Sequence, residues 1–134
     1  MLTHSFAFSG FAVPDIEAAH HFYGTVIGLD VAVVDMGQLS IELPGGGWVL
    51  VYPKPDHVPA TYTVLNLEVD DIDRAIDELE AAGVELARYP GMEQDARGIA
   101  RGLASGQGPD IAWFTDPAGN ILSVLQNPTA PAGD

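Results

Sequence analysis

The chain has 134 residues, no cysteine, and 19 acidic against 5 basic side chains, which gives a formal net charge of −14. Its 47% hydrophobic and 18% charged residues are typical of a folded domain, and the missing cysteines exclude disulfides, thiolate metal sites and cysteine nucleophiles. The acidic balance disfavours nucleic acid and anionic membranes as partners. The opening MLTHSFAFSG lacks the pattern of a signal peptide and no apolar run has membrane-spanning length, so we expect a cytoplasmic protein.

The first part of the chain predicts a strand, a helix and three more strands. Asp15 is a suitable helix N-cap because its carboxylate can accept hydrogen bonds from the free N–H groups of the first turn, and Gly28 is a typical helix stop. Runs of β-prone residues separated by turn residues follow. The predicted elements are a strand at 5–13, a helix at 15–27, and strands at 29–36, 38–43 and 48–53, with a Pro-Gly-Gly-Gly turn at 44–47.

A second set of elements follows a proline-rich linker at 54–60. Asp71 is again a helix N-cap, Gly83 is again a helix stop, and Ile72, Ala75, Ile76 and Leu79 form one apolar helix face. A glycine-rich stretch then interrupts the pattern, and loops of this length are usually functional or mobile. The predicted elements are strands at 61–69 and 84–89, a helix at 71–82, a loop at 90–109 with a helical turn near 92–96, a hairpin of strands at 110–116 and 120–126, and a disordered tail after 126.

The two sets are copies of one plan. AVPDIEAAHHFYGTVIGLDV (12–31) and EVDDIDRAIDELEAAGVEL (68–86) each run from a strand end through an acidic N-cap and an amphipathic helix to a glycine. We therefore predict an α+β fold of two βαβββ modules within one domain. The predicted organisation is one domain over 1–128, with modules at 4–53 and 61–126, and a flexible tail at 129–134.

Three segments in this order, VPDIEAAHHFYGTVIGL, VDDIDRAIDELEAAGV and FTDPAGN, resemble the vicinal oxygen chelate superfamily, which groups glyoxalase, bleomycin resistance and dioxygenase proteins. The resemblance covers about residues 5–126. It implies that the two βαβββ modules form a curved mixed sheet around a cleft, and it implies a homodimer. It does not imply one function, because the fold carries several chemistries and some proteins that only bind.

In metal-dependent members of this superfamily, four strand positions hold a divalent ion. The positions that match them here are Phe8, Leu50, Val64 and Ser123, none of which is a competent ligand apart from the weak serine hydroxyl. Asn66 and Glu68 share a strand face with Val64 but do not make up a ligand set. We therefore expect no metal and no other cofactor.

The four histidines offer no replacement site. His20 and His21 are adjacent on the predicted helix, so they point about 100° apart and cannot both hold one ion. His4 precedes the first strand, and His57 lies in the linker. None of them is placed to activate Ser123, so we interpret Ser123 as a small polar group in a metal-free cleft and not as a nucleophile.

What remains is an apolar and aromatic strand face with a few polar groups, the usual composition of a small-molecule pocket. The alternative is a filled core in which Phe8 and Leu50 plug the former metal site. The predicted pocket residues are Phe6, Phe8, Trp48, Leu50, Tyr52, Val64, Asn66, Glu68, Trp113 and Ser123.

These observations predict a metal-independent binding protein that sequesters an antibiotic or another small metabolite, with a cationic ligand favoured by the net charge of −14. The alternative class is an enzyme, namely a lyase, isomerase or dioxygenase with a displaced metal site or a metal-free acid/base pair; Glu68 and the 90–109 loop leave room for it. A third possibility is a protein kept for dimer or partner contacts, with its cleft filled.

Overall fold

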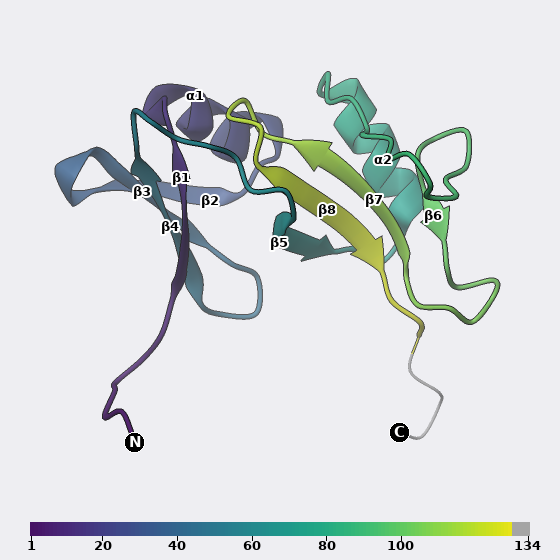
Figure 1. Ribbon diagram of the computed structural model, residues 1–134, viewed down its shortest axis with the longest axis horizontal. Helices are drawn as coiled ribbons and strands as arrows, with labels where there is room; N and C mark the ends of the chain where they lie inside the picture. Colours follow the sequence, from purple (N-terminus) through teal and green to yellow (C-terminus); the bar gives the residue numbers. More distant parts are fainter. Residues whose placement is uncertain (130–134) are drawn as a thin grey trace. The chain divides into compact units, whose positions relative to one another are not determined.

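The computed structural model describes residues 1–129; the end of the predicted tail, 130–134, lies outside them. The chain divides into two compact units, unit 1 (Met1–Pro59) and unit 2 (from Ala60 onward). Each unit holds one four-stranded mixed sheet and one helical segment, so the predicted α+β fold of two βαβββ modules is confirmed (Figure 1). Within the described residues, no helix has the length and apolar character needed to cross a membrane.

The sheet of unit 1 has the strand order β1-β4-β3-β2. β1 is parallel to β4, and the other neighbours are antiparallel. A helical segment follows β1. The elements are β1 (Ser9–Val13), α1 (Ile16–His20), the π-helix η1 (His21–Val26), β2 (Asp30–Val34), the 3-10 turn η2 (Asp35–Gly37), β3 (Gln38–Glu42) and β4 (Trp48–Pro53).

The helix predicted over 15–27 is present but changes its winding. Asp15 is its N-cap, as expected: Oδ1 accepts hydrogen bonds from the backbone N–H groups of Glu17 and Ala18, both at 3.1 Å. After α1 the hydrogen bonds span one residue more, since Ile27 N donates to Phe22 O at 2.9 Å. Gly28, with φ +82°, then ends the segment in a conformation that a side chain would disfavour.

The core of unit 1 lies on one face of its sheet. Alternate strand residues are buried on this face together with Ala19, Phe22 and Tyr23 of the helical segment. Because side chains alternate across a strand, the residues between them lie on the opposite face. The buried strand residues are Phe11, Val13, Leu39, Ile41, Val49 and Val51.

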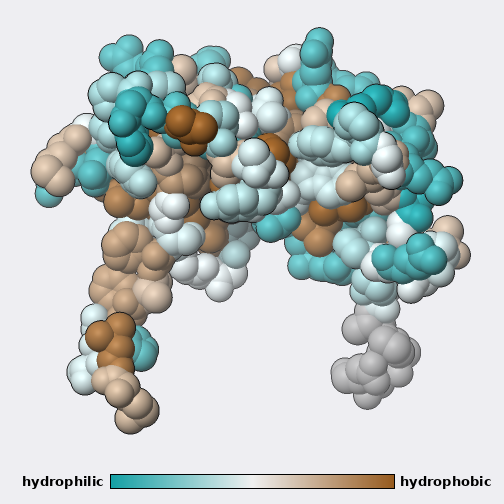
Figure 2. Space-filling model, viewed as in Figure 1, coloured by the Kyte–Doolittle hydropathy of each residue, from teal (hydrophilic) through white to brown (hydrophobic). Residues whose placement is uncertain are grey.

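The strand predicted over 5–13 forms only from Ser9. Its partner β4 begins at Trp48, directly after the glycine-rich turn, and Ser9 is paired with Val49. In this register Phe8 lies at the level of Trp48, and residues before Phe8 meet no partner on β4, although Phe6 favours β structure. Residues 1–8 are exposed and run away from β1 as an arm with a largely apolar surface (Figures 1 and 2).

Unit 2 repeats the topology with the strand order β5-β8-β7-β6, and β5 is parallel to β8. Its helix is longer and regular, and the predicted apolar face (Ile72, Ala75, Ile76, Leu79) is buried as expected. The N-cap Asp71 accepts from Arg74 N at 3.2 Å. The elements are β5 (Thr63–Glu68), α2 (Ile72–Ala81), β6 (Ala100–Arg101), β7 (Asp110–Thr115) and β8 (Ile121–Gln126).

The strand predicted at 84–89 is not formed, and this prediction was wrong. Ala87 N donates to Trp113 O at 2.7 Å, but the edge of β7 is completed by the two residues of β6. The side chain of Gln94 explains the difference. Its Oε1 accepts from Tyr89 N at 2.9 Å, and its Nε2 donates to Ala87 O at 3.1 Å and to Gly98 O at 2.7 Å. One amide thus satisfies backbone groups that a strand ladder would have used.

The loop at 90–109 also differs from its prediction. The expected helical turn near 92–96 is absent, and short turns lie at 90–91 and 96–97 instead. Asp95 organises the loop, because its Oδ1 accepts from Arg97 N at 2.8 Å and from Ile99 N at 2.9 Å. These bonds fix the loop backbone from within.

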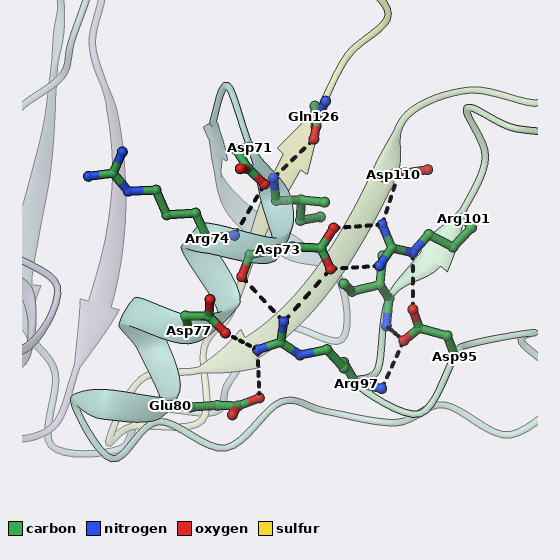
Figure 3. A network of polar contacts seen from close by, with 12 residues as sticks. Asp71, Asp73, Arg74, Asp77, Glu80, Asp95, Arg97, Arg101, Asp110 and Gln126 are labelled. Atoms are coloured by element: carbon green, nitrogen blue, oxygen red, sulfur yellow. Dashed lines mark hydrogen bonds and ion pairs between the residues drawn. The ribbon is translucent and has the colours of Figure 1, made fainter.

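Two arginines tie this loop to α2 (Figure 3). Arg101 contacts Asp73 at 2.8 Å, Asp95 at 3.0 Å and the buried Asp110 at 3.3 Å. Arg97 contacts Asp77 and Glu80 on the same helix, at 2.6 and 3.4 Å. We call these residues the arginine network.

The arginine network changes the pKa of its carboxylates. The hydrogen bond from Arg101 is the largest influence on the pKa of Asp73 and lowers it, whereas desolvation acts in the opposite direction. Burial by itself would raise the pKa of Asp95, but the hydrogen bonds from Ile99 N, Arg101 and Arg97 N together lower it. The acids in turn raise the pKa of Arg101, chiefly through Asp73. Both carboxylates therefore stay ionised to a lower pH in the folded protein than in the unfolded chain.

We expect Arg101→Met to lower the free energy of unfolding at pH 7 by about 1 kcal/mol, a value that allows for solvent screening of these partly exposed groups. Since the folded pKa values of Asp73 and Asp95 are depressed, their stabilisation is present above about pH 4 and is lost as the pH falls below it. Thermal melts over a pH series should show this loss in the wild type and a flatter profile in Arg101→Met. Arg74→Met is the control, because the Arg74–Glu78 pair is exposed; an unchanged acid slope in Arg101→Met would contradict the expectation.

The turn between β7 and β8 depends on a buried carboxylate. Asp116 is 4% exposed, and its side chain accepts from Ala118 N at 2.9 Å, Asn120 N at 2.8 Å and Asn120 Nδ2 at 3.0 Å.

We expect Asp116→Ala to lower the free energy of unfolding by about 2 kcal/mol, because buried donors lose their acceptor. Denaturant titration measures the change. The exposed Asp70→Ala should leave stability nearly unchanged, and equal effects of the two variants would contradict this reason.

Candidate functional site

A groove lies on the face of the unit 1 sheet that points away from the buried core. We call this face of the sheet, in each unit, the open face. The volume of the groove is about 770 Å³. Trp48 and Leu50 of β4 and Gln38, Ser40 and Glu42 of β3 alternate with the buried core residues of their strands, so their side chains share the face away from the core. The complete lining is Phe8, Val34, Asp35, Gln38, Ser40, Glu42, Leu43, Gly46, Gly47, Trp48 and Leu50.

Aromatic rings form one wall of this groove. The rings of Phe8 and Trp48 are stacked, with centroids 4.0 Å apart and planes inclined by 15°. The ring of Phe6 lies 6.2 Å from that of Phe8 in a tilted arrangement. Phe8 is 50% exposed and Trp48 is partly exposed, so the aromatic wall is open to solvent.

The turn between β3 and β4 forms another wall. Leu43 N donates to Gly47 O at 3.0 Å, and Gly46 N donates to Leu43 O at 3.1 Å. Gly46 and Gly47 have φ values of +99° and +84°, which residues with a side chain rarely adopt. The sequence Pro-Gly-Gly-Gly is therefore needed to bring the turn back over the start of β4.

The charges at the groove are all negative. Asp35 and Glu42 contribute carboxylates, whereas the neutral polar groups come from Gln38 and Ser40. The one Lys or Arg in residues 1–59 is Lys54, which is ion-paired with Asp56 outside the groove. A cation is therefore favoured in this groove and an anion is disfavoured.

The structure brings together three of the five pocket residues predicted in unit 1. Phe8, Trp48 and Leu50 line the groove. Tyr52 lies further along β4 and is 37% exposed outside the lining, while Phe6 is 67% exposed and reaches the groove only through its contact with Phe8. The polar residues of β3 were missed, although the alternation of the strand predicted at 38–43 could have indicated them.

Asn66, Trp113 and Ser123 come together on the open face of unit 2. Ser123 is paired with Asn66 on one side and with Trp113 on the other. Ser123 Oγ donates to Asn66 Oδ1 at 2.6 Å, and Trp113 Nε1 donates to Thr63 Oγ1 at 3.1 Å. Ser123 is fully buried (0% exposed), as expected for a small polar group with a hydrogen-bond partner.

The other predicted residues of unit 2 are less closely placed. Val64 lies at an irregularity in the pairing of β5 with β8, and Glu68 is exposed at the end of β5. The ring of Tyr89, which was not predicted, packs edge-on against Trp113 with centroids 5.6 Å apart. Tyr89 was missed because this contact joins two residues that are 24 positions apart in the sequence.

The residues at the expected metal positions do not fit a divalent ion. In unit 1, β1 and β4 place Gly10 beside Leu50, and Phe8 stacks on Trp48. In unit 2 the Asn66 and Ser123 oxygens are hydrogen-bonded to each other. No three His, Asp or Glu side chains of residues 1–129 gather into a group that could hold a metal ion. Ring, hydrocarbon and hydroxyl groups lie at the positions where carboxylate or imidazole ligands would be required.

A second hollow, of about 510 Å³, lies in unit 2 and is lined by residues of the 90–109 segment and by Ile111 of β7. Its charged lining includes Asp95 and Arg101, which already pair with each other in the arginine network. The remaining polar side chains are exposed or serve the loop backbone, as Gln94 does. The groove of unit 1 is therefore the stronger candidate site.

Solved structures share this fold. The chain is similar to TnmS3, an antibiotic binding protein from Streptomyces sp. CB03234 (23% identity, 95% of this chain and 100% of that chain covered, TM-score 0.64). It is also similar to the fosfomycin resistance protein FosX from Listeria monocytogenes (13% identity, 95% and 96% covered, TM-score 0.66) and to a glyoxalase/dioxygenase from Nostoc punctiforme (17% identity, 96% and 100% covered, TM-score 0.63). At these identities the likeness shows the fold alone.

The family is shown by a match over nearly the whole sequence. Residues 4–124 match the family model described as Glyoxalase/Bleomycin resistance protein/Dioxygenase superfamily. The matched span includes both modules and the turn at Asp116, the features on which the resemblance was based. This chain therefore belongs to the glyoxalase/bleomycin resistance/dioxygenase superfamily.

Proposed function

We propose that this protein is a metal-independent binder of a small organic cation that carries an aromatic ring, and that the groove of unit 1 is its binding site. The observation that carries the proposal is the Phe8–Trp48 stack beside the carboxylates of Asp35 and Glu42. Ring faces attract other rings and cations, and the carboxylates add charge attraction. Together they select a ligand that is both flat and positive.

The size of the groove supports a small molecule. Its volume of about 770 Å³ falls in the range of ligand pockets, roughly 300–1,000 Å³. Its lining combines apolar side chains such as Leu50 with the polar groups of Gln38 and Ser40, which can orient a ligand by hydrogen bonds. This mixture is typical of specific small-molecule sites.

The distribution of positive charge supports a cationic ligand. The chain has 5 Lys and Arg residues, and each of them makes an internal contact. Arg88, for example, donates to the backbone carbonyls of Asp95 and Ala96. Because the chain has 19 acidic against 5 basic side chains, the summed field of its charges attracts cations toward the surface.

The family supports a binding function in a general way. One structure with the same fold is described as an antibiotic binding protein. Sequestration of a ligand needs a shaped and charged groove but no reacting group. It therefore does not require metal ligands, and the residues at the expected metal positions do not fit a divalent ion. The homodimer, and the contribution of Asn66, Glu68, Val64, Trp113 and Ser123 to binding, stay predictions.

The first test removes the aromatic platform. N-methylquinolinium, a flat aromatic cation, is titrated into the wild type and Trp48→Ala by isothermal calorimetry. We expect Trp48→Ala to weaken binding roughly ten- to a hundredfold, because both stacking and cation–π attraction are lost. Trp48→Phe should recover part of the affinity, and the exposed Val58→Ala should bind as the wild type does. Equal affinities of the wild type and Trp48→Ala would refute the site.

The second test removes the charge at the groove. Asp35→Asn and Glu42→Gln should each weaken N-methylquinolinium binding about two- to fivefold, as expected for exposed charges, and should reduce its salt dependence. Naphthalene-2-sulfonate, a flat aromatic anion, should bind more weakly than the cation to the wild type. Glu17→Gln on α1 is the matched control. Tighter binding of the anion than of the cation by the wild type would contradict the proposed role of the groove carboxylates.

A further inference from the structure

Phe8 occupies the surface that an aromatic ligand would use. Its ring lies over Trp48 at a centroid distance of 4.0 Å, with an interplanar angle of 15°. This is the geometry of one flat ring stacked on another, so there is no room for a third ring between them. The bound position of Phe8 is therefore also the position that a ligand ring stacked on this face of Trp48 would take.

The attachment of Phe8 allows it to leave. Phe8 directly precedes Ser9, the first residue of β1, and belongs to the exposed arm 1–8. Its side chain is 50% exposed, so half of its surface is not held by packing. Core residues of the same unit, such as Phe11 on β1, are buried and paired within the sheet. Movement of Phe8 thus requires no opening of the core.

We propose that Phe8 is an internal competitor for the Trp48 face, which makes it the residue that sets the specificity of the groove for flat aromatic rings. In the free protein Phe8 stacks on Trp48, and a ligand ring displaces it. This inference rests on the proposed function, because it concerns the same groove. It adds that the groove selects flat aromatic rings and that Phe8 is the residue responsible for this selection.

The selection follows from competition. A flat ring with positive charge replaces the Phe8 contact and adds attraction to Trp48 and to the groove carboxylates. A saturated cation offers the charge without the ring, so it cannot replace the stacking that it would have to break. The apparent dissociation constant of any displacing ligand is raised by the fraction of time that Phe8 covers Trp48. Removing the Phe8 ring should therefore tighten binding.

The alternative role for Phe8 is that of a fixed wall. A ligand would then stack on the outer face of Phe8 and leave the Phe8–Trp48 contact intact. Removing the Phe8 ring would weaken binding, because a contact surface would be lost. The two roles predict changes of opposite sign in the same variant.

The experiment measures N-methylquinolinium binding to the wild type, Phe8→Ala and Phe8→Leu by isothermal calorimetry. We expect both variants to bind about two- to tenfold more tightly than the wild type, which corresponds to the strength of one aromatic contact. N,N,N-trimethylcyclohexylammonium, a saturated cation, should bind the wild type more weakly than N-methylquinolinium does. Leu2→Ala, on the same exposed arm, is the control and should bind as the wild type does.

Nuclear magnetic resonance of the two tryptophan indole N–H groups locates the event. The Trp48 signal should move in Phe8→Ala before any ligand is added and again on titration, while Trp113, whose Nε1 is bonded to Thr63, reports on unit 2. Weaker binding in Phe8→Ala with loss of binding in Trp48→Ala would overturn the competitor role and keep the proposed function. Binding that is unaffected by Trp48→Ala would overturn the proposed function, and with it this inference.

Discussion

The fold of each unit depends on a helical segment that packs against one face of a four-stranded sheet. Side chains alternate across every strand, so each strand contributes one set of residues to the helix-covered core and another set to the opposite face. In unit 1 the buried set includes Ile41 and Val51, and their neighbours Ser40 and Leu50 line the groove. The site is thus a consequence of having a helix on one side of the sheet only.

Duplication of the module leaves the open face of each unit free to change. In unit 1 this face carries the stacked rings of Phe8 and Trp48 and a groove with acidic groups. In unit 2 it carries the hydrogen-bonded pair of Asn66 and Ser123, with Trp113 beside them. Both faces have side chains that satisfy one another where a metal-dependent relative would direct ligands at an ion. The two open faces therefore differ in chemistry although the two sheets have the same strand topology.

The basic residues are also divided unequally between the two units. Arg97 and Arg101 are used within unit 2 to hold the 90–109 loop against α2. Two of the 5 basic residues thus serve ion pairs within unit 2. The loop resembles a mobile segment in composition, yet Gln94, Asp95 and the two arginines fix its backbone by specific bonds.

Local sequence signals determined where the helices start, where the first helical segment ends and how far β4 extends. Asp15 and Asp71 mark both helix starts, Gly28 follows the first helical segment, and the alternation in 48–53 matches β4 in both extent and facing. These features depend on near neighbours in the chain, so they can be predicted without a fold. The duplication of the pattern then indicated the module and the superfamily, and the resemblance identified four positions that lack a competent metal ligand.

Only the tertiary structure decided which segments find a partner. Residues 5–8 favour β structure, but β4 begins at Trp48 and leaves them as an exposed arm. Residues 84–89 favour a strand too, but the Gln94 side chain takes their backbone bonds. The stacking of Phe8 on Trp48 and the gathering of Asp35 and Glu42 at one groove join residues far apart in sequence. Such contacts are fixed by register and loop geometry, which the residue pattern of a single segment does not contain.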